Sequence, residues 1–164
     1  MHDVIVVGGG IVGMSTAYHL ARAGASTLLL DRDDPGRATN AGAGILSPET
    51  NSRDPEAWFD FALAAVAYYP TLMQHLQEDQ GGETGYARCG QLVVAVSADE
   101  VPLFERARGL VFGRQERRGW PRSEDLYEIS SSAAQALFPP LAPLHGAMYY
   151  RHAARVDGRL LNSA

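Results

Sequence analysis

Lysine is absent from this chain of 164 residues, and cysteine occurs only once, at Cys89. All 14 basic residues are arginines, so this stretch holds neither the lysine of a Walker-type phosphate loop nor a lysine for a Schiff base. A single cysteine cannot form an internal disulfide, which fits the reducing cytoplasm. Because strand-like sequence surrounds it, we interpret Cys89 as a small strand residue and not as a nucleophile.

Long hydrophobic runs are also missing. No window approaches the roughly 20 apolar residues of a membrane span. The apolar run at the N-terminus is broken by glycines and lacks the basic residues of a signal peptide. The net charge of -5 argues against a nucleic-acid or anionic-membrane partner. In the stretch 105–122 arginines alternate with glutamates, which favours a solvated helical face over a nucleic-acid patch. We therefore expect a soluble, cytoplasmic protein.

Recognisable metal and hydrolase patterns do not occur either. His145 and His152 are the only neighbouring histidines, and their separation is not that of metal ligands. The chain has no G-x-S-x-G elbow and no recognisable pair of catalytic carboxylates. The sequence therefore predicts no metal site, and no catalytic residue can be named in it.

Glycine, in contrast, is concentrated near the start. The β-branched run at residues 4–7 is typical of a strand buried on both faces of a parallel sheet. It leads into G-x-G-x-x-G at Gly8, Gly10 and Gly13, followed by a helical pattern that ends near Gly24. This strand–glycine–helix order is the context in which such a motif binds a dinucleotide. A glycine-rich turn in an unrelated α/β protein is the weaker alternative.

Each part of this unit has a physical task. Gly8 permits the sharp turn, Gly10 lets a pyrophosphate touch the backbone, and Gly13 lets the helix pack against the strand. A second strand, predicted over residues 27–30, ends on Asp31, whose carboxylate can accept the hydroxyls of an adenosine ribose. An acid at this position disfavours NADP. Arg32 is either a contact to phosphate or adenine, or an exposed charge.

The stretch after Asp31 favours a flavin over a nicotinamide. Its sequence is RDDPGRATNAGAGILSPE, and from Ala38 to Gly44 almost every side chain is small, so an extended backbone can lie against a large flat ligand. Thr39 and Asn40 add short hydrogen-bonding groups. A flexible Gly/Ala linker is the alternative, but the apolar pair Ile45-Leu46 that follows at once disfavours it.

The chain resembles the FAD-dependent amino-acid oxidases of the D-amino-acid oxidase and glycine oxidase type. Three segments carry the resemblance: VIVVGGGIVGMSTAYHLARAG, GRATNAGAGILSP and DPEAWFDFALAAVAYYPTL. The resemblance implies an α/β fold with a Rossmann-like, parallel-sheet FAD-binding domain and the start of an antiparallel-sheet α+β substrate domain. It implies FAD-binding segments at 1–82 and 151–164 and a partial substrate domain at 83–150.

The resemblance also implies which residues bind FAD. The glycines of the motif would hold the pyrophosphate, Asp31 the ribose, and the segment from Thr39 onward the ribitol and the isoalloxazine ring. Asn40 is often serine in relatives, so its contact is the least secure of these. The predicted cofactor residues are Gly8, Gly10, Ile11, Val12, Gly13, Asp31, Arg32, Thr39, Asn40, Ala41, Gly42, Ala43, Gly44 and Ile45.

The implied reaction passes a hydride from the α-carbon of a small amino acid or secondary amine to the flavin. Glycine, sarcosine and D-amino acids are the expected substrates, and oxygen or an electron carrier is the expected acceptor. An amino-acid dehydrogenase and a non-catalytic nucleotide-binding module stay open as alternatives, as does a homo-oligomer. The family's substrate-binding residues are expected beyond Ala164, so we expect this chain to be an N-terminal portion that is inactive alone.

Three further structural expectations follow from local patterns. A helix should begin at Asp54-Pro55 and run to about Leu76, with a kink or interruption at Pro70. The sequence GYARCGQLVVAVS predicts two strands paired with each other around Cys89-Gly90. Asp157 or Asn162 should begin the last helix.

Overall fold

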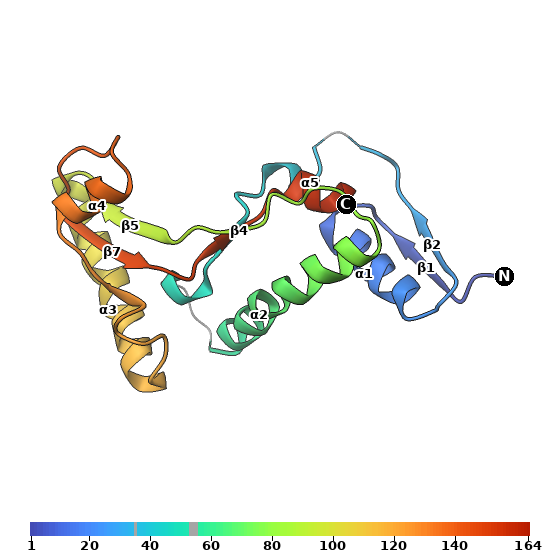
Figure 1. The fold of residues 1–164 in the computed structure, drawn as a ribbon, viewed down its shortest axis with the longest axis horizontal. Coiled ribbons are helices and arrows are strands. Elements are labelled where there is room, and N and C mark those ends of the chain that lie inside the picture. Colours follow the sequence, from blue (N-terminus) through green and yellow to red (C-terminus); the bar gives the residue numbers. More distant parts are fainter. Residues whose placement is uncertain (35, 53–55) are drawn as a thin grey trace. The chain divides into compact units, whose positions relative to one another are not determined.

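The computed structural model describes residues 1–34, 36–52 and 56–164, and these residues form two compact units (Figure 1). The first unit comprises residues 1–44, 72–86 and 156–164, and the second comprises residues 45–71 and 87–155. The elements, in chain order, are β1 (Val4–Val7), α1 (Ile11–Arg22), β2 (Thr27–Leu30), the 3₁₀ turn η1 (Ala38–Ala41), β3 (Ile45–Leu46), η2 (Pro48–Thr50), α2 (Glu56–Glu78), β4 (Ala87–Arg88), β5 (Gln91–Ala95), η3 (Ala98–Glu100), α3 (Val101–Arg118), β6 (Leu126–Glu128), α4 (Ser131–Leu137), β7 (Gly146–Tyr150), β8 (Ala154–Arg155) and α5 (Gly158–Ser163).

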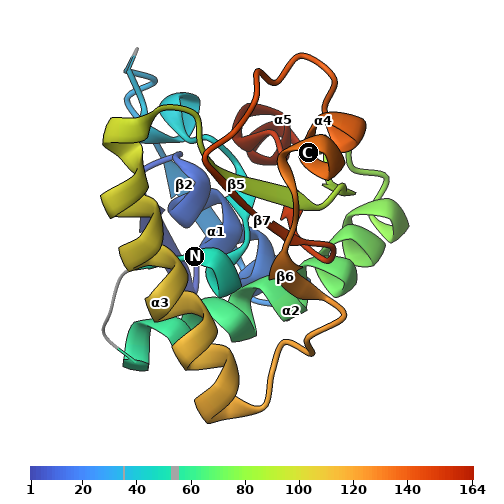
Figure 2. The same ribbon diagram turned by 90° about the vertical axis from the view of Figure 1, so that its left-hand side faces the viewer.

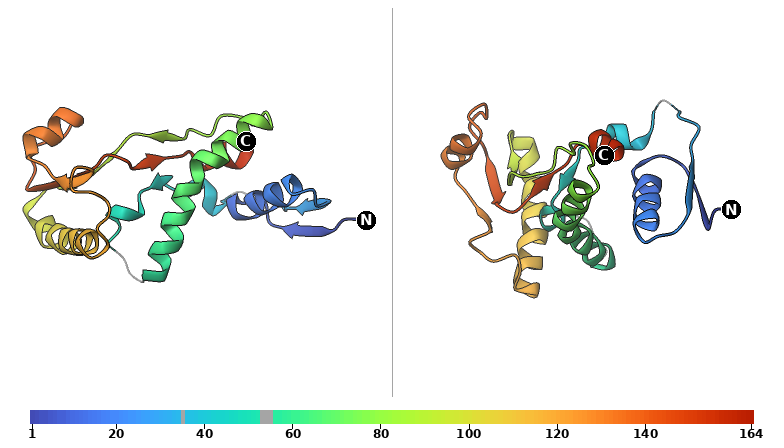
Figure 3. Two further views of the ribbon diagram at one scale, coloured as in Figure 1. Left: turned by 60° about the horizontal axis from the view of Figure 1, so that its bottom comes forward. Right: turned by 45° about the vertical axis from the view of Figure 1, so that its right-hand side comes forward.

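The first unit is built on a parallel pair of strands. β1 and β2 pair in register from Val4 opposite Thr27 to Val7 opposite Leu30, and α1 connects them and packs against both. The left view of Figure 3 shows α1 lying along the two strands. β-Branched and aliphatic side chains suit these strands, and Gly24, with a φ of +90°, reverses the chain after α1. The predicted strand–helix–strand unit is confirmed.

The last helix, α5, also belongs to the first unit. Asp157 caps its N-terminus, because the Asp157 side chain accepts hydrogen bonds from the backbone N–H groups of Arg159 at 2.8 Å and Leu160 at 3.2 Å. Of the two candidate starting residues, Asp157 is therefore the correct one. Asn162 lies inside the helix instead and faces other partners.

The second unit contains two antiparallel sheets, in the orders β5-β7-β6 and β3-β8-β4. Its core lies between the first of these sheets and α3, which packs against β5 and β7 (Figure 2). Met148 on β7 is fully buried there, as are Leu126 on β6 and Val111 on α3. The antiparallel sheet predicted for this part of the chain is confirmed.

Two expectations about the second unit were wrong. β4 and β5 do not pair with each other: β4 pairs with β8 and β5 with β7, because Gly90 between them has a φ of +71° and redirects the chain. The arginine-rich face is not wholly solvated either. Arg114 is buried, lies over the ring of Phe59 at 4.2 Å, and donates a hydrogen bond to the carbonyl of Asn51 at 2.8 Å.

Helix α2 differs from expectation as well. It continues through Pro70, so the proline does not interrupt it, although it removes one backbone donor. Asp54 and Pro55, the predicted first residues of this helix, lie outside the described residues. No helix among the residues that the structure describes is long and apolar enough to cross a membrane. The domain boundaries at 82/83 and 150/151 stay predictions.

Candidate functional site

The glycine loop between β1 and α1 is so tightly folded that it excludes side chains. Gly8 has a φ of +111°, a conformation that residues with a Cβ rarely adopt. A Cβ on Gly13 would lie 1.8 Å from the carbonyl oxygen of Gly8, which is far inside any allowed contact. A Cβ on Gly10 would lie 3.4 Å from Oγ1 of Thr39. The three motif glycines thus form a cradle of bare backbone at the N-terminus of α1.

Helix α1 begins without a side-chain cap. Its N-cap is Gly10, and its first turn carries no acidic residue. Helix N-termini present unpaired N–H groups and a partial positive charge, which favour an anion such as phosphate. Thr39 satisfies one of these groups, because its Oγ1 accepts a hydrogen bond from the N–H of Ile11 at 2.9 Å. The first turn of the helix is thus tied to the 38–45 segment.

Asp31 follows β2 and closes the other side of the loop. Its Oδ2 accepts a hydrogen bond from the N–H of Gly9, and its Oδ1 accepts one from the N–H of Asp33 at 2.7 Å and pairs with Arg37. The bond from Gly9, followed by those from Asp33 and Arg37, lowers the pKa of the Asp31 carboxyl, so it is ionised at neutral pH. A carboxylate has about four acceptor positions, so one remains for a ligand hydroxyl.

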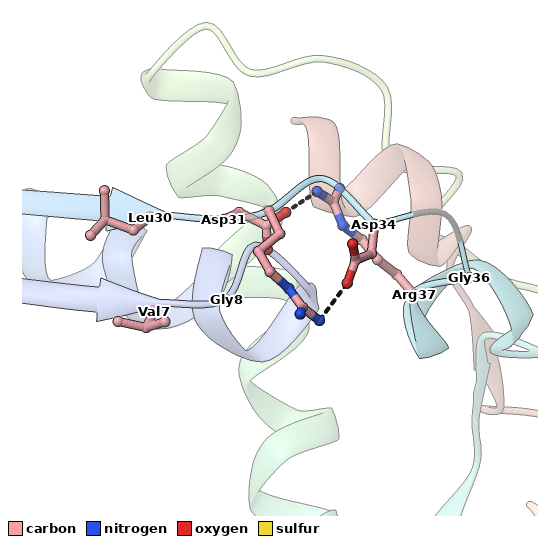
Figure 4. A pocket seen from close by; sticks show the side chains of 8 residues that line it. Val7, Gly8, Leu30, Asp31, Asp34, Gly36 and Arg37 are labelled. Carbon is pink, nitrogen blue, oxygen red and sulfur yellow. Dashed lines mark hydrogen bonds and ion pairs between the residues drawn. The ribbon is translucent and has the colours of Figure 1, made fainter.

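A cavity of about 550 Å³ opens beside Asp31 (Figure 4). Apolar side chains from the ends of both strands, Val7 and Leu30, lie on one side of it, and polar residues of the following loop lie on the other. Val7 is 81% exposed and Leu30 48% exposed, so this apolar surface is available to a flat ring. The residues that line the cavity are Val7, Gly8, Leu30, Asp31, Arg32, Asp34, Gly36 and Arg37.

Arg32 and Arg37 differ in how they are held. Arg32 is highly exposed and pairs with Asp34 at 2.5 Å, so it lines the cavity as a solvated ion pair. Arg37 pairs with Asp31 and so fixes its carboxylate (Figure 4). Arg37 also pairs with Asp33 at 2.9 Å. Sequence reasoning missed Arg37; the only available signal was a cation six positions after the key acid, in a loop that must fold back.

The 38–45 segment depends on glycine at its end. Gly44 has a φ of +67°, and a Cβ there would lie 1.8 Å from the carbonyl oxygen of Val156. The N–H of Val156 in turn donates to the carbonyl of Gly44 at 2.9 Å. The small side chains before Gly44, at positions 40–43, are exposed. The backbone is not extended throughout this segment, contrary to the prediction, because Ala38–Ala41 forms the 3₁₀ turn η1. That these residues contact a ligand stays a prediction.

The structure brings together six of the fourteen predicted residues: Gly8, Gly10, Ile11, Gly13, Asp31 and Thr39. Gly8 contacts Gly13, Gly10 and Ile11 contact Thr39, and Asp31 contacts the intervening Gly9. Val12 is exposed. Ile45 belongs to the second unit, where it pairs with Arg155.

Sequence comparison identifies the family. The sequence profile of the DAO family, described as FAD dependent oxidoreductase, matches residues 3–164. The chain belongs to this family of FAD-dependent oxidoreductases. The predicted relationship and fold class are confirmed.

The relatives of this FAD-dependent oxidoreductase include enzymes that act on amines. It is 37% identical over 161 residues to the oxidoreductase YurR of Bacillus subtilis (strain 168), covering 98% of this chain and 42% of that protein. It is 31% identical over 137 residues to glycine oxidase of Bacillus licheniformis, covering 83% and 36%. Among solved structures it matches iminodiacetate oxidase from Chelativorans sp. BNC1, with a TM-score of 0.84, 36% identity and coverage of 98% and 42%.

The match is therefore to part of each relative. The chain spans about two fifths of the length of the proteins it matches. The described residues contain no group of three or more histidine, cysteine or acidic side chains that could hold a metal ion.

The site fits the nucleotide part of the family's cofactor. The backbone of Gly8, Gly10 and Gly13 carries no side chains, Gly13 tolerates none because a Cβ there would lie 1.8 Å from the carbonyl oxygen of Gly8, and the ionised Asp31 follows the end of β2. The N-terminus of α1 suits an anion, and the carboxylate of Asp31, 22 residues after Gly9, suits a hydroxyl group. A diphosphate joined to a ribose carries both groups.

Proposed function

We propose that this chain forms the main part of the FAD site of an enzyme that oxidises the C–N bond of a small amino acid or secondary amine. The observation that carries the proposal is the cradle formed by Gly8, Gly10 and Gly13 beside Asp31, in a chain of the FAD-dependent oxidoreductase family. When bound, FAD supplies the acceptor for the hydride that leaves the substrate.

The residues of this chain act by binding and orientation. The backbone of the glycine loop and the N-terminus of α1 would hold the diphosphate, and Asp31 would accept a hydrogen bond from the ribose. Thr39, Asn40 and the backbone from Ala41 to Ile45 would lie along the ribitol and the flavin ring. Ile11, Val12 and Arg32 complete the proposed set, with Arg32 at the adenosine end of the cavity.

The substrate class rests on the relatives. Glycine oxidase and iminodiacetate oxidase are named for substrates in which a nitrogen adjoins a carbon that carries a carboxylate. We therefore propose glycine, sarcosine, a D-amino acid or a similar secondary amine as substrate. Oxygen is the proposed acceptor, with an electron carrier as the dehydrogenase alternative. A cytoplasmic location and a homo-oligomer stay predictions.

The first experiment is a visible absorption spectrum of the natural polypeptide that carries this chain, before and after anaerobic addition of amines. Flavin bands that bleach with glycine, sarcosine, iminodiacetate or D-alanine support the proposal. Bands that persist with all four amines contradict the proposed substrate class but still support FAD as the cofactor. A colourless protein that takes up no added FAD contradicts the cofactor itself.

Substitution of Gly44 separates a flavin site from a module that binds only a nucleotide. We expect Gly44→Ala to lose flavin binding, because the new Cβ would overlap the carbonyl of Val156. ADP binding, measured by calorimetry, should persist, because the clash at Gly44 is with the backbone of Val156 and with no glycine of the cradle. Gly82→Ala is the matched control: it lies in the same unit, and its Cβ would meet its nearest neighbour at 4.0 Å.

A further inference from the structure

We propose that Asn162 is a positioning residue for the cofactor: its amide holds the carbonyl of Gly9 and so sets the glycine loop in the form that receives the diphosphate. The inference rests on the proposed FAD site and concerns a residue that contacts the glycine loop through the carbonyl of Gly9. Nδ2 of Asn162 donates to the carbonyl oxygen of Gly9 at 3.1 Å, across a sequence separation of 153 residues.

Gly9 is held at both of its polar backbone atoms. Its N–H donates to Asp31, and its carbonyl accepts from Asn162. A trans peptide is planar, with its C=O and N–H pointing in opposite directions. Fixing the carbonyl of Gly9 therefore also fixes the direction of the next N–H, that of Gly10, which caps α1. Asn162 thus aims a backbone donor of the cradle away from itself.

Helix α5 is well placed to hold Asn162 still. It packs against both α1 and η1, two elements that contain predicted cofactor residues. Its start is fixed by the Asp157 cap and by Gly158, where a Cβ would lie 3.0 Å from the carbonyl oxygen of Thr39. The short helix is therefore held in one position, and the Asn162 amide stays within hydrogen-bonding distance of the Gly9 carbonyl.

The environment of Oδ1, the oxygen of the Asn162 amide, supports a specific role for Nδ2, its nitrogen. Oδ1 of Asn162 is buried and has no hydrogen-bond partner among the described residues. Burying an unsatisfied polar atom is unfavourable, and an apolar side chain of similar size would avoid it. The benefit of asparagine at this position therefore lies in the Nδ2 donor.

The test is FAD affinity in the natural polypeptide, measured by titrating the apoprotein and following flavin fluorescence. Asn162→Leu keeps the approximate size and removes the donor, and we expect the Kd for FAD to rise about tenfold, the effect of one lost hydrogen bond. The thermal midpoint of the apoprotein should match that of Ser163→Ala, a control on the same helix whose hydroxyl contacts only its own backbone turn, at Arg159.

A pH profile separates positioning from a merely structural role. Asn162→Asp faces the Gly9 carbonyl with a carboxylate at about pH 8, and FAD binding should be weaker than in the Leu variant. The amide oxygen of Asn162 is buried, so burial and the facing carbonyl oxygen should raise the pKa of an Asp carboxyl there above the ordinary value of about 3.9. Lowering the pH toward that raised pKa should protonate the carboxyl and restore an O–H donor toward Gly9, so affinity should recover in the Asp variant only. This second variant also keeps the test decisive if the Leu variant does not fold.

The outcomes that overturn the inference are distinct from those that overturn the proposed function. A wild-type protein that binds no FAD overturns the proposed function and the inference with it. A wild-type protein that binds FAD, beside an Asn162→Leu variant of equal affinity, overturns the inference alone. An affinity loss in the Asp variant that does not respond to pH does the same.

Discussion

The two units of this chain are stabilised in different ways. The second unit has a packed interior, in which Met148 is 0% exposed and Leu126 and Val111 are 1% exposed. In the first unit α1 has no buried residue, and Val7 on β1 is 81% exposed. Burial of apolar surface stabilises the second unit, whereas close backbone contacts and hydrogen bonds shape the first.

This difference teaches where each unit is sensitive to substitution. In the second unit the important property is the volume of side chains that fill the interior. In the first unit it is the absence of side chains at a few positions, because Gly13 and Gly44 each meet a carbonyl oxygen where a Cβ would stand.

The largest effect should come from Gly13→Ala. The added Cβ would overlap the carbonyl oxygen of Gly8, so the loop must move and FAD binding should be lost completely. Gly109→Ala in α3 is the control, because nothing lies within 4 Å of its Cβ position. There, alanine should stabilise the helix by about 1 kcal/mol. FAD titration and thermal unfolding of both variants check this, and retained FAD binding by Gly13→Ala would break the comparison.

A smaller effect, confined to stability, should follow from Met148→Ala. Removing a fully buried side chain from the second unit should lower the free energy of unfolding by about 2–5 kcal/mol. Leu103→Ala, at a position that is 71% exposed, should change it far less. Chemical denaturation measures both. Equal losses in the two variants would show that this interior does not stabilise the unit.

The smallest effect should be a pH dependence at Glu49. This carboxyl is 5% exposed, and its Oε1 accepts a hydrogen bond from the hydroxyl of Tyr150 at 3.0 Å. Burial raises the pKa of Glu49 above its unfolded value. The folded state therefore holds the proton more tightly, and stability is full below the unfolded pKa of about 4.5 and falls as pH rises through the folded pKa.

Glu49→Gln removes this titration. The stability of the variant relative to wild type should increase as pH rises above about 4.5, at most by about 1.4 kcal/mol for each unit by which the pKa is raised. Tyr150→Phe sharpens the test, since the Tyr150 hydroxyl lowers the pKa of Glu49 and its loss should widen the pH dependence. Thermal midpoints at several pH values measure both, and a constant difference between Glu49→Gln and wild type would refute the assignment.

The part of the first unit that could be predicted is local in sequence. β1, the glycine turn, α1 and β2 follow from patterns within 30 residues, and Asp31 follows from the end of a strand. The local sequence preferences of these consecutive elements all favour the same fold, so they can be predicted together. The confirmed family relationship extends further, because the family profile matches residues 3–164.

The part that could not be predicted depends on contacts between distant segments. Local alternation predicted two strands around Gly90 but not their partners, because β8 and β7 lie more than 50 residues further on. Asn162 was taken as a possible cap, since nothing in its neighbourhood signals a bond to Gly9. The sequence around Arg114 predicts an exposed arginine, because nothing in it indicates the contact with the ring of Phe59.

The three-part construction of the first unit has a consequence for synthesis on the ribosome. The glycine loop is made first, but Val156, Gly158 and Asn162, which close against the two cofactor segments, are among the last residues of this chain to appear. At usual translation rates the loop waits on the order of 10 s for them. During that interval the nascent chain carries a nucleotide motif without the hydrogen bond from Asn162, so the loop should not be set for tight cofactor binding before Asn162 has emerged.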